Sequence, residues 1–157
     1  MARLGELTAS AETRVLPELV GRWRLAAWEI THGPDEILRP LGYDAEGLLI
    51  YTAEGSMAVQ ITAADRRPLG GADPLGGSER QRAAAYSTCL AYCGRYEVCG
   101  ETVVHTVEMS LFPDWAGARQ VRLFELVGDR LTLRTPPIAV GEAEVIAELR
   151  WVREAAT

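Results

Sequence analysis

Lysine and asparagine are absent from this chain of 157 residues, and all 16 of its basic residues are arginines. Without lysine the chain cannot form a Schiff base with a carbonyl substrate or anchor pyridoxal phosphate. The net charge is −6 and the arginines are dispersed along the sequence. A basic nucleic-acid-binding patch is therefore not indicated, and we expect no nucleic acid as a partner.

Cysteine is scarce, and long apolar segments are missing. The three cysteines are Cys89, Cys93 and Cys99. On one strand the first two would lie roughly 13 Å apart, too far for a disulfide, and the three could not converge on one zinc ion. We expect free thiols in a reducing compartment and no metal. No window is apolar enough to span a membrane, and the start of the chain lacks the pattern of a signal peptide, so we expect a cytoplasmic protein without a membrane partner.

Signatures of nucleotide and covalent chemistry are also missing. The glycine-rich segment 63–77 has no lysine to complete a phosphate-binding loop, and no G-x-G-x-x-G pattern occurs. No nucleophile elbow or metal cluster is present either, so we expect no cofactor. The length and the 48% hydrophobic content predict a single domain over residues 1–157 with a sizeable core.

What the chain does have is a strong hairpin pattern over residues 90–112, LAYCGRYEVCGETVVHTVEMSLF. Two β-rich segments flank Gly100 and Glu101, which favours a tight turn there. The register then pairs Tyr96 with His105 and carries two phenols and an imidazole on an otherwise apolar face. Such a face is typical of a strand pair that lines a cavity. The predicted inward residues are Tyr92, Gly94, Tyr96, Val98, Val103, His105, Val107 and Met109.

Similar alternation predicts the other strands. They are 21–32, a weaker strand at 36–39, a hairpin of 48–52 with 56–62, a hairpin of 120–127 with 130–135, and 143–153. In the first strand Glu29 falls on the face of Trp23. In the 48–62 hairpin a turn at residues 54–55 places Leu48, Ile50, Thr52, Met57, Val59 and Ile61 toward the core. The opposite face then carries Leu49, Tyr51, Ala58 and Gln60. In the 120–135 hairpin, parity places Arg122 and Thr135 on the same face as Phe124 and Leu133. The last strand, 143–153, directs Val145, Ala147, Leu149 and Trp151 inward.

Two helices are expected. Residues 10–20 have Ser10 as a possible N-cap and Gly21 as a terminator. Residues 78–86 begin with a capping box made by Ser78 and Gln81, and can form a lid or a plug. The whole pattern predicts an all-β fold: an eight-stranded antiparallel up-and-down barrel with a short N-terminal helix and a short helix near 78–86, with room for one small ligand.

Several segments resemble the bacterial and fungal lipocalin-like domain family. The Gly21-x-Trp23 strand start is similar to the lipocalin signature, and the resemblance extends in order through LVGRWRLAAWE, LGYDAEGLLIYTAEGSM, AYCGRYEV, VVHTVEMSLFPDWAG, QVRLFEL and LRWVRE. The resemblance implies a calycin-type barrel in which Trp23 packs at the closed end and Arg153 lies across it. Secreted lipocalins carry a signal peptide and disulfides, which are not expected here.

The candidate catalytic residues are His105, Tyr96, Arg122 and Glu29. His105 beside Tyr96 can act as a general acid or base, or can be a core histidine satisfied by a phenol. A buried Arg122 needs a partner, which is either Glu29 in a structural ion pair or an enolate or carboxylate of a ligand. The candidate ligand-binding residues are Tyr92, Met57, Val59, Val107, Met109, Trp115, Phe124 and Leu133. Of these, Tyr92 could equally be an ordinary residue of the barrel core, and Trp115 either contacts the ligand at the rim of the barrel or caps the core.

Three functions fit this pattern. The favoured one is a cofactor-independent cyclase or isomerase acting on a hydrophobic polyketide-like or terpenoid-like substrate, which would stabilise an enolate in a held conformer. The alternative is a non-catalytic carrier of a small hydrophobic ligand. The third is a barrel filled by its own side chains that acts through protein contacts. A homodimer is compatible with each of them.

Overall fold

In the computed structural model, which describes residues 14–155, ten strands form one continuous antiparallel sheet. The short apolar and polar alternations of the sequence become strands whose inner faces share one core. The elements are η1 (Pro17–Leu19), β1 (Gly21–His32), β2 (Glu36–Leu38), β3 (Glu46–Tyr51), β4 (Ser56–Thr62), α1 (Glu79–Ser87), β5 (Cys89–Cys99), β6 (Thr102–Ser110), η2 (Pro113–Trp115), β7 (Arg119–Val127), β8 (Arg130–Arg134), β9 (Ile138–Val140) and β10 (Ala143–Arg153).

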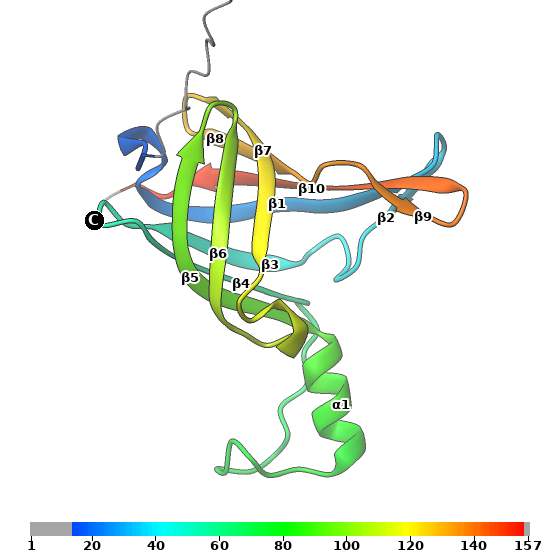
Figure 1. Cartoon of the computed structure of the whole chain (residues 1–157). Helices are drawn as coiled ribbons and strands as arrows, with labels where there is room; N and C mark the ends of the chain where they lie inside the picture. The colour runs from blue at the N-terminus through cyan, green and yellow to red at the C-terminus, as the bar shows by residue number, and fades with distance from the viewer. Residues whose placement is uncertain (1–13, 156–157) are drawn as a thin grey trace, which may run out of the picture.

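Eight of these strands close into a barrel. Their order is β1-β3-β4-β5-β6-β7-β8-β10, and pairing of β1 with β10 completes the ring. β2 and β9 pair only with the far ends of β1 and β10 and extend beyond the barrel (Figure 1). The predicted up-and-down antiparallel barrel is confirmed. β9 was not predicted; it is three residues long and directly follows Pro136 and Pro137.

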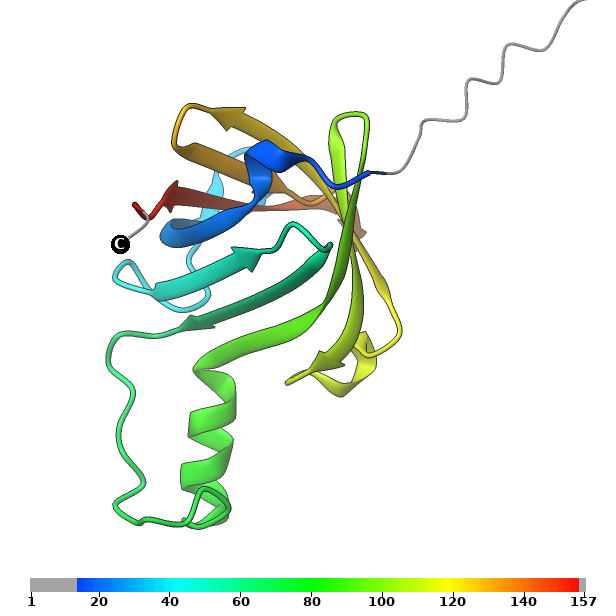
Figure 2. The same ribbon diagram turned by 90° about the vertical axis from the view of Figure 1, so that its left-hand side faces the viewer.

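The helix after β4 forms as predicted but does not cover the barrel. Ser78 and Gln81 make the capping box, and α1 then stands away from the barrel at the end opposite η1 (Figure 2). No residue of α1 is buried, so in this structure it is not a plug. Within residues 14–155 no helix has the length and apolarity needed to cross a membrane.

The predicted N-terminal helix is largely replaced by other structure. Residues 10–13 lie outside the described part of the chain, Arg14 forms an isolated bridge with Val98, and only the 3-10 turn η1 follows. Pro17 stands at the first position of that turn. Proline is compatible with the first turn of a helix but blocks a helix that continues through it.

The closed end of the barrel is built around Trp23, as the lipocalin resemblance implies. Its indole is fully buried and donates a hydrogen bond to the carbonyl oxygen of Leu19 at 2.9 Å. The guanidinium of Arg153 lies 4.1 Å from the centre of the Trp23 ring and donates to the carbonyl oxygen of Val20 at 2.8 Å. The cation and the turn before β1 thus cover the indole.

Irregular positions change which side chains face inward. Between Leu25 and Ala27 the register of β1 against β10 shifts by one residue, and such a bulge reverses the parity of everything beyond it. Trp28 therefore lines the interior, whereas Glu29 turns outward to Arg39, at 2.5 Å, and Arg150, at 3.0 Å. The expected inward position of Glu29 is therefore wrong, and of the two partners considered for Arg122, Glu29 is excluded.

The β3–β4 turn has three residues between the paired residues Thr52 and Ser56, whereas the sequence predicted a two-residue turn at 54–55. The backbone N–H of Thr52 donates to the carbonyl oxygen of Ser56 at 2.9 Å, and Gly55 adopts a positive φ of 83°. Leu49 therefore pairs with Val59 and Tyr51 with Met57. The predicted inward places of Leu48 and Ile50 are wrong, because a shift of one residue exchanges the two faces.

The central hairpin keeps its predicted register only up to Gly94. Gly100 and Glu101 form the turn, Tyr96 pairs with His105, and Gly94 pairs with Val107. A bulge then follows, so that Tyr92 pairs with Ser110, and Met109 is 66% exposed on the outer face. The prediction that Met109 faces the interior is therefore wrong.

Candidate functional site

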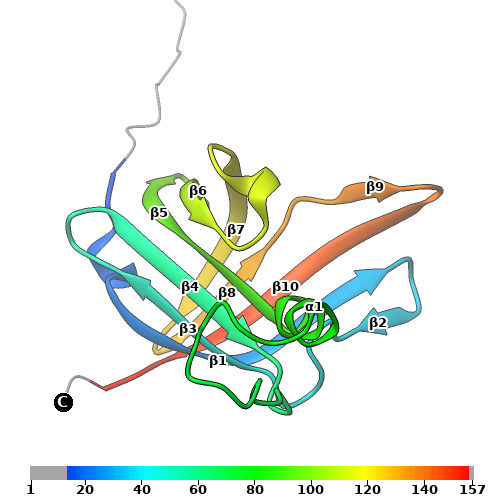
Figure 3. The same ribbon diagram turned by 90° about the horizontal axis from the view of Figure 1, so that it is seen from below.

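A cavity of about 540 Å³ occupies the interior of the barrel. Its volume lies in the range of pockets that hold a small organic molecule. The walls are mainly aliphatic and aromatic and include Trp28, Leu49, Leu90, Leu133 and Leu149. They bring together β1, β3, β5, β8 and β10, which surround the interior when the molecule is seen from below (Figure 3). The barrel is hollow, so the interpretation of a core filled by its own side chains is not supported.

A chain of three hydrogen-bonded rings lies at one side of this cavity. His105 is 1% exposed. Its Nε2 lies 2.6 Å from the hydroxyl oxygen of Tyr51, and its Nδ1 lies 2.9 Å from the hydroxyl oxygen of Tyr92. Tyr51 comes from β3, Tyr92 from β5 and His105 from β6. The neighbouring strands β5 and β6, together with β3 on the far side of β4, therefore place a phenol on each side of the imidazole.

All three rings are neutral at neutral pH. Burial, and to a smaller extent the nearby charge of Arg122, lower the pKa of His105 from 6.5 to about 3. Burial raises the pKa of Tyr51 well above its ordinary value. Burial also raises the pKa of Tyr92, although the charge of Arg122 opposes this rise. An imidazole with so low a pKa is a very weak base.

The expected contact between the hydroxyl of Tyr96 and His105 does not form, although the two residues pair in register. The hydroxyl of Tyr96 donates to the carbonyl oxygen of Thr52 at 2.8 Å. Its ring packs against Tyr51 with the centroids 4.4 Å apart. Tyr51, which sequence reasoning placed outward, thus has the position that was expected for Tyr96.

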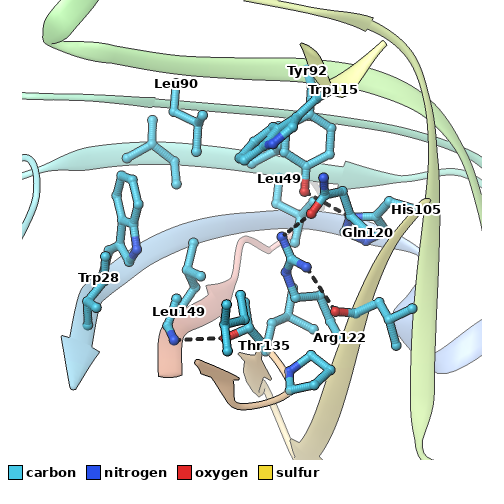
Figure 4. A pocket seen from close by; sticks show the side chains of 18 of the residues that line it. Trp28, Leu49, Leu90, Tyr92, His105, Trp115, Gln120, Arg122, Thr135 and Leu149 are labelled. Carbon is cyan, nitrogen blue, oxygen red and sulfur yellow. Dashed lines mark hydrogen bonds between the residues drawn. The ribbon is translucent and has the colours of Figure 1, made fainter. Parts of the chain in front are cut away.

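Arg122 extends from β7 into the cavity beside this chain. Its guanidinium donates to the backbone carbonyl oxygen of Val121 at 2.8 Å and to the side-chain oxygen of Gln120 at 3.2 Å. Figure 4 shows the guanidinium directed toward Gln120 and Tyr92, with Trp28 and Leu90 on the opposite side of the cavity. Among residues 14–155 no acidic side chain forms an ion pair with Arg122.

The predicted ligand-binding residues divide into three groups. Those that line the cavity are Tyr92, Val59, Trp115 and Leu133. Trp115 meets Tyr92 edge to face with the ring centres 5.6 Å apart. Those that pack in or against the barrel core without lining the cavity are Met57, Val107 and Phe124. Met109 lies outside.

Several residues that line the cavity were not nominated as ligand contacts from the sequence, each for a different reason. Gln120 shares the parity of Arg122 and could have been nominated from that alone. Thr135, Ala147 and Leu149 were predicted to face inward but were not proposed as ligand contacts. Trp28 lies beyond the bulge of β1, so its position had no signal in the alternation.

Neither the cysteines nor a group of metal-ligating side chains contributes to this site in the described residues. All three cysteines are free, as predicted. In the described residues no group of three histidine, cysteine, aspartate or glutamate side chains is placed to hold a metal ion.

Fold and site together define a hollow eight-stranded antiparallel barrel, closed at one end by Trp23 and Arg153 and carrying polar side chains on one cavity wall. The family model described as a lipocalin-like domain matches residues 20–154. The chain belongs to this lipocalin-like domain family.

Among curated proteins, the chain is similar to the 4'-hydroxy-3'-methoxypropiophenone carrier protein ppsC of Aspergillus oryzae (strain ATCC 42149 / RIB 40). The two are 34% identical over 90 residues, which cover 52% of this chain and 81% of that protein. No solved structure matches the chain significantly.

Proposed function

We propose that this protein binds one small, largely apolar aromatic molecule inside the barrel and acts as its carrier. The observation that carries the proposal is a cavity of about 540 Å³ with apolar walls and a localised polar side formed by Tyr92, Gln120 and Arg122. Apolar walls supply binding energy, whereas a few fixed polar groups orient the molecule. The polar side is rich in donors, so the molecule should carry an acceptor oxygen there.

The similarity to a protein named as a carrier of 4'-hydroxy-3'-methoxypropiophenone supports this choice. A hydroxylated phenone has an aromatic ring for the apolar walls and oxygens for the donors. We therefore take this compound as the first probe.

A cyclase or isomerase is less well supported by the geometry than a carrier. Acid–base catalysis is most effective when the catalytic group titrates near the operating pH. Burial instead keeps the pKa of His105 at about 3, and Glu29 lies outside the cavity in ion pairs with Arg39 and Arg150. Two of the four residues nominated for catalysis are thus poorly suited to proton transfer.

Calorimetric titration with 4'-hydroxy-3'-methoxypropiophenone tests the proposal. We expect saturable binding of one molecule per chain, together with a change in tryptophan fluorescence, because Trp28, Trp115 and Trp151 line the cavity. Ala147→Phe fills the cavity and should weaken binding at least about tenfold, or by about 1.4 kcal/mol. Ala58→Phe, on the exposed outer face of β4, is the matched control and should bind normally.

Absence of saturable binding refutes the proposal for this class of molecule. Binding that Ala147→Phe leaves unchanged refutes the location. After prolonged incubation the compound should be recovered chemically unchanged, and its conversion to a new product would favour an enzyme over a carrier.

A further inference from the structure

The hydrogen bonds of His105 determine which way the hydroxyl of Tyr92 points. A neutral imidazole has one N–H donor and one acceptor nitrogen. The hydroxyl of Tyr51 is buried, and His105 Nε2, at 2.6 Å, is its only hydrogen-bond partner among residues 14–155. A buried hydroxyl uses its proton where it has an acceptor, so Tyr51 donates to Nε2 and the imidazole proton resides on Nδ1.

It follows that Nδ1–H donates to the oxygen of Tyr92 across 2.9 Å. The proton of Tyr92 is then not used within this chain of rings. Tyr92 lines the cavity and its oxygen already accepts one hydrogen bond, so its O–H is directed at the cavity. The chain of rings thus orients Tyr92 as a donor toward a bound molecule.

The second donor at this position is Arg122. It keeps N–H groups beyond the two that bond to Val121 and Gln120. Among residues 14–155, those that line the cavity include no aspartate and no glutamate. A partly buried guanidinium without a carboxylate is a fixed positive charge in an apolar surrounding, where its attraction for an anion is stronger than in water.

We propose that the cavity selects the ionised form of its ligand, holding a phenolate or enolate oxygen between the Tyr92 hydroxyl and the Arg122 guanidinium. This inference rests on the proposed carrier function and names the chemical class of the ligand. The hydroxyl proton of the ligand is released to solvent on binding. Tyr92 donates to the resulting oxyanion without transferring its own proton.

The pH dependence of binding should then belong to the ligand. The titratable side chains that face Arg122 from the neighbouring strands are Tyr51, Tyr92 and His105, with Tyr96 behind them. Burial keeps His105 neutral above about pH 3 and raises the pKa of each of these three tyrosines. Charged side chains near this level pair with one another: Glu29 with Arg39 and Arg150, Glu97 with Arg119, and Glu148 with Arg134. Of these, Arg119 also lines the cavity, where its charge is paired with Glu97.

Absorption spectroscopy of the bound probe tests the selection. The phenolate of 4'-hydroxy-3'-methoxypropiophenone absorbs at longer wavelength than the neutral phenol, so its ionisation can be followed as a function of pH in the free and the bound state. We expect the pKa of the bound hydroxyl to fall by at least about one unit, which corresponds to tenfold tighter binding of the anion than of the neutral form. 3',4'-Dimethoxypropiophenone, which cannot ionise, should bind with an affinity independent of pH between about 5 and 8.

Two variants assign the effect to the proposed donors. Arg122→Met removes the charge but keeps an apolar stem, and should abolish most of the pKa decrease. Tyr92→Phe should reduce it by a smaller amount. Arg134→Met removes the same charge from the outer face, where Arg134 pairs with Glu148, and should preserve the decrease.

The outcomes separate this inference from the proposed function. A probe that binds inside the barrel with an unchanged or raised pKa overturns anion selection and keeps the carrier. A pKa decrease that persists in Arg122→Met overturns the assigned site. If neither phenone binds at any pH, both proposals fall.

Discussion

The buried imidazole of His105 should make the stability of the barrel depend on pH. Its pKa is lowered from 6.5 to about 3 in the folded chain, first by burial and then by the charge of Arg122. The unfolded chain therefore binds a proton near pH 6.5 that the folded chain does not bind, so the free energy of unfolding decreases as the pH falls from about 6.5 toward 3. Each pH unit in this window corresponds to about 1.36 kcal/mol. At pH 5, about 1.5 units below the ordinary value, His105 alone should remove about 2 kcal/mol.

Urea unfolding of the unmodified chain and of His105→Gln at pH 7, 6 and 5 measures this contribution. The carboxylates titrate in both proteins, so their effect cancels in the difference between the two profiles. We expect the unmodified chain to lose about 2 kcal/mol more than the variant between pH 7 and pH 5. His32→Gln is the matched control, because His32 is the other histidine and lies beside Glu36 at the barrel surface. This control should keep the full dependence.

Parallel profiles for the unmodified chain and His105→Gln would refute the reasoning. Should the variant not fold, nuclear magnetic resonance of the imidazole in the unmodified chain gives the same answer. The signals of His105 should stay those of the neutral ring down to pH 5. A midpoint near pH 6.5 would show that the ring is not isolated from solvent.

Three further predictions concern the scaffold. Gly94→Ala should destabilise the fold by more than about 3 kcal/mol in thermal or urea unfolding, because a Cβ there would lie 2.1 Å from the carbonyl oxygen of Thr106. Gly71→Ala is the control: Gly71 has open space around it, so this variant should change stability by less than about 0.5 kcal/mol. Equal effects of the two variants would contradict the close approach of the strands at Gly94. Ser78→Ala should cost α1 about 1 kcal/mol through loss of its cap, seen as faster hydrogen exchange confined to the helix. Faster exchange throughout the barrel strands would contradict this. Arg153→Met should lower the free energy of unfolding by about 1 to 3 kcal/mol, and an unchanged value would show that the cation over the Trp23 indole is dispensable.

The barrel itself was predictable from local patterns. Alternation located β1, β4, β7 and β10, and tight turns at Gly100 and Gly128 determined the registers of the two hairpins around them. These features are encoded within a few residues, so sequence alone contains them. Capping chemistry at Ser78 likewise located α1.

The site was only partly predictable, because single extra residues reverse parity without leaving a trace in the alternation. The bulges in β1 and β6 moved Glu29 and Met109 outward. The odd β3–β4 turn moved Tyr51 inward, which replaced the expected Tyr96 as the partner of His105. The choice between these registers depends on packing across the barrel, which is not local in sequence. By contrast, the inward position of Arg122 followed from parity, since no irregularity intervenes in β7.

A crystal structure of the protein with 4'-hydroxy-3'-methoxypropiophenone tests the central claim most directly, namely that the barrel is a carrier cavity with a donor-rich side. We expect one molecule inside the barrel, with its phenolic oxygen within hydrogen-bonding distance of both the Tyr92 hydroxyl and the Arg122 guanidinium. Density for the compound only on the outer face near Met109, or its phenolic oxygen directed away from Tyr92 and Arg122, would contradict it.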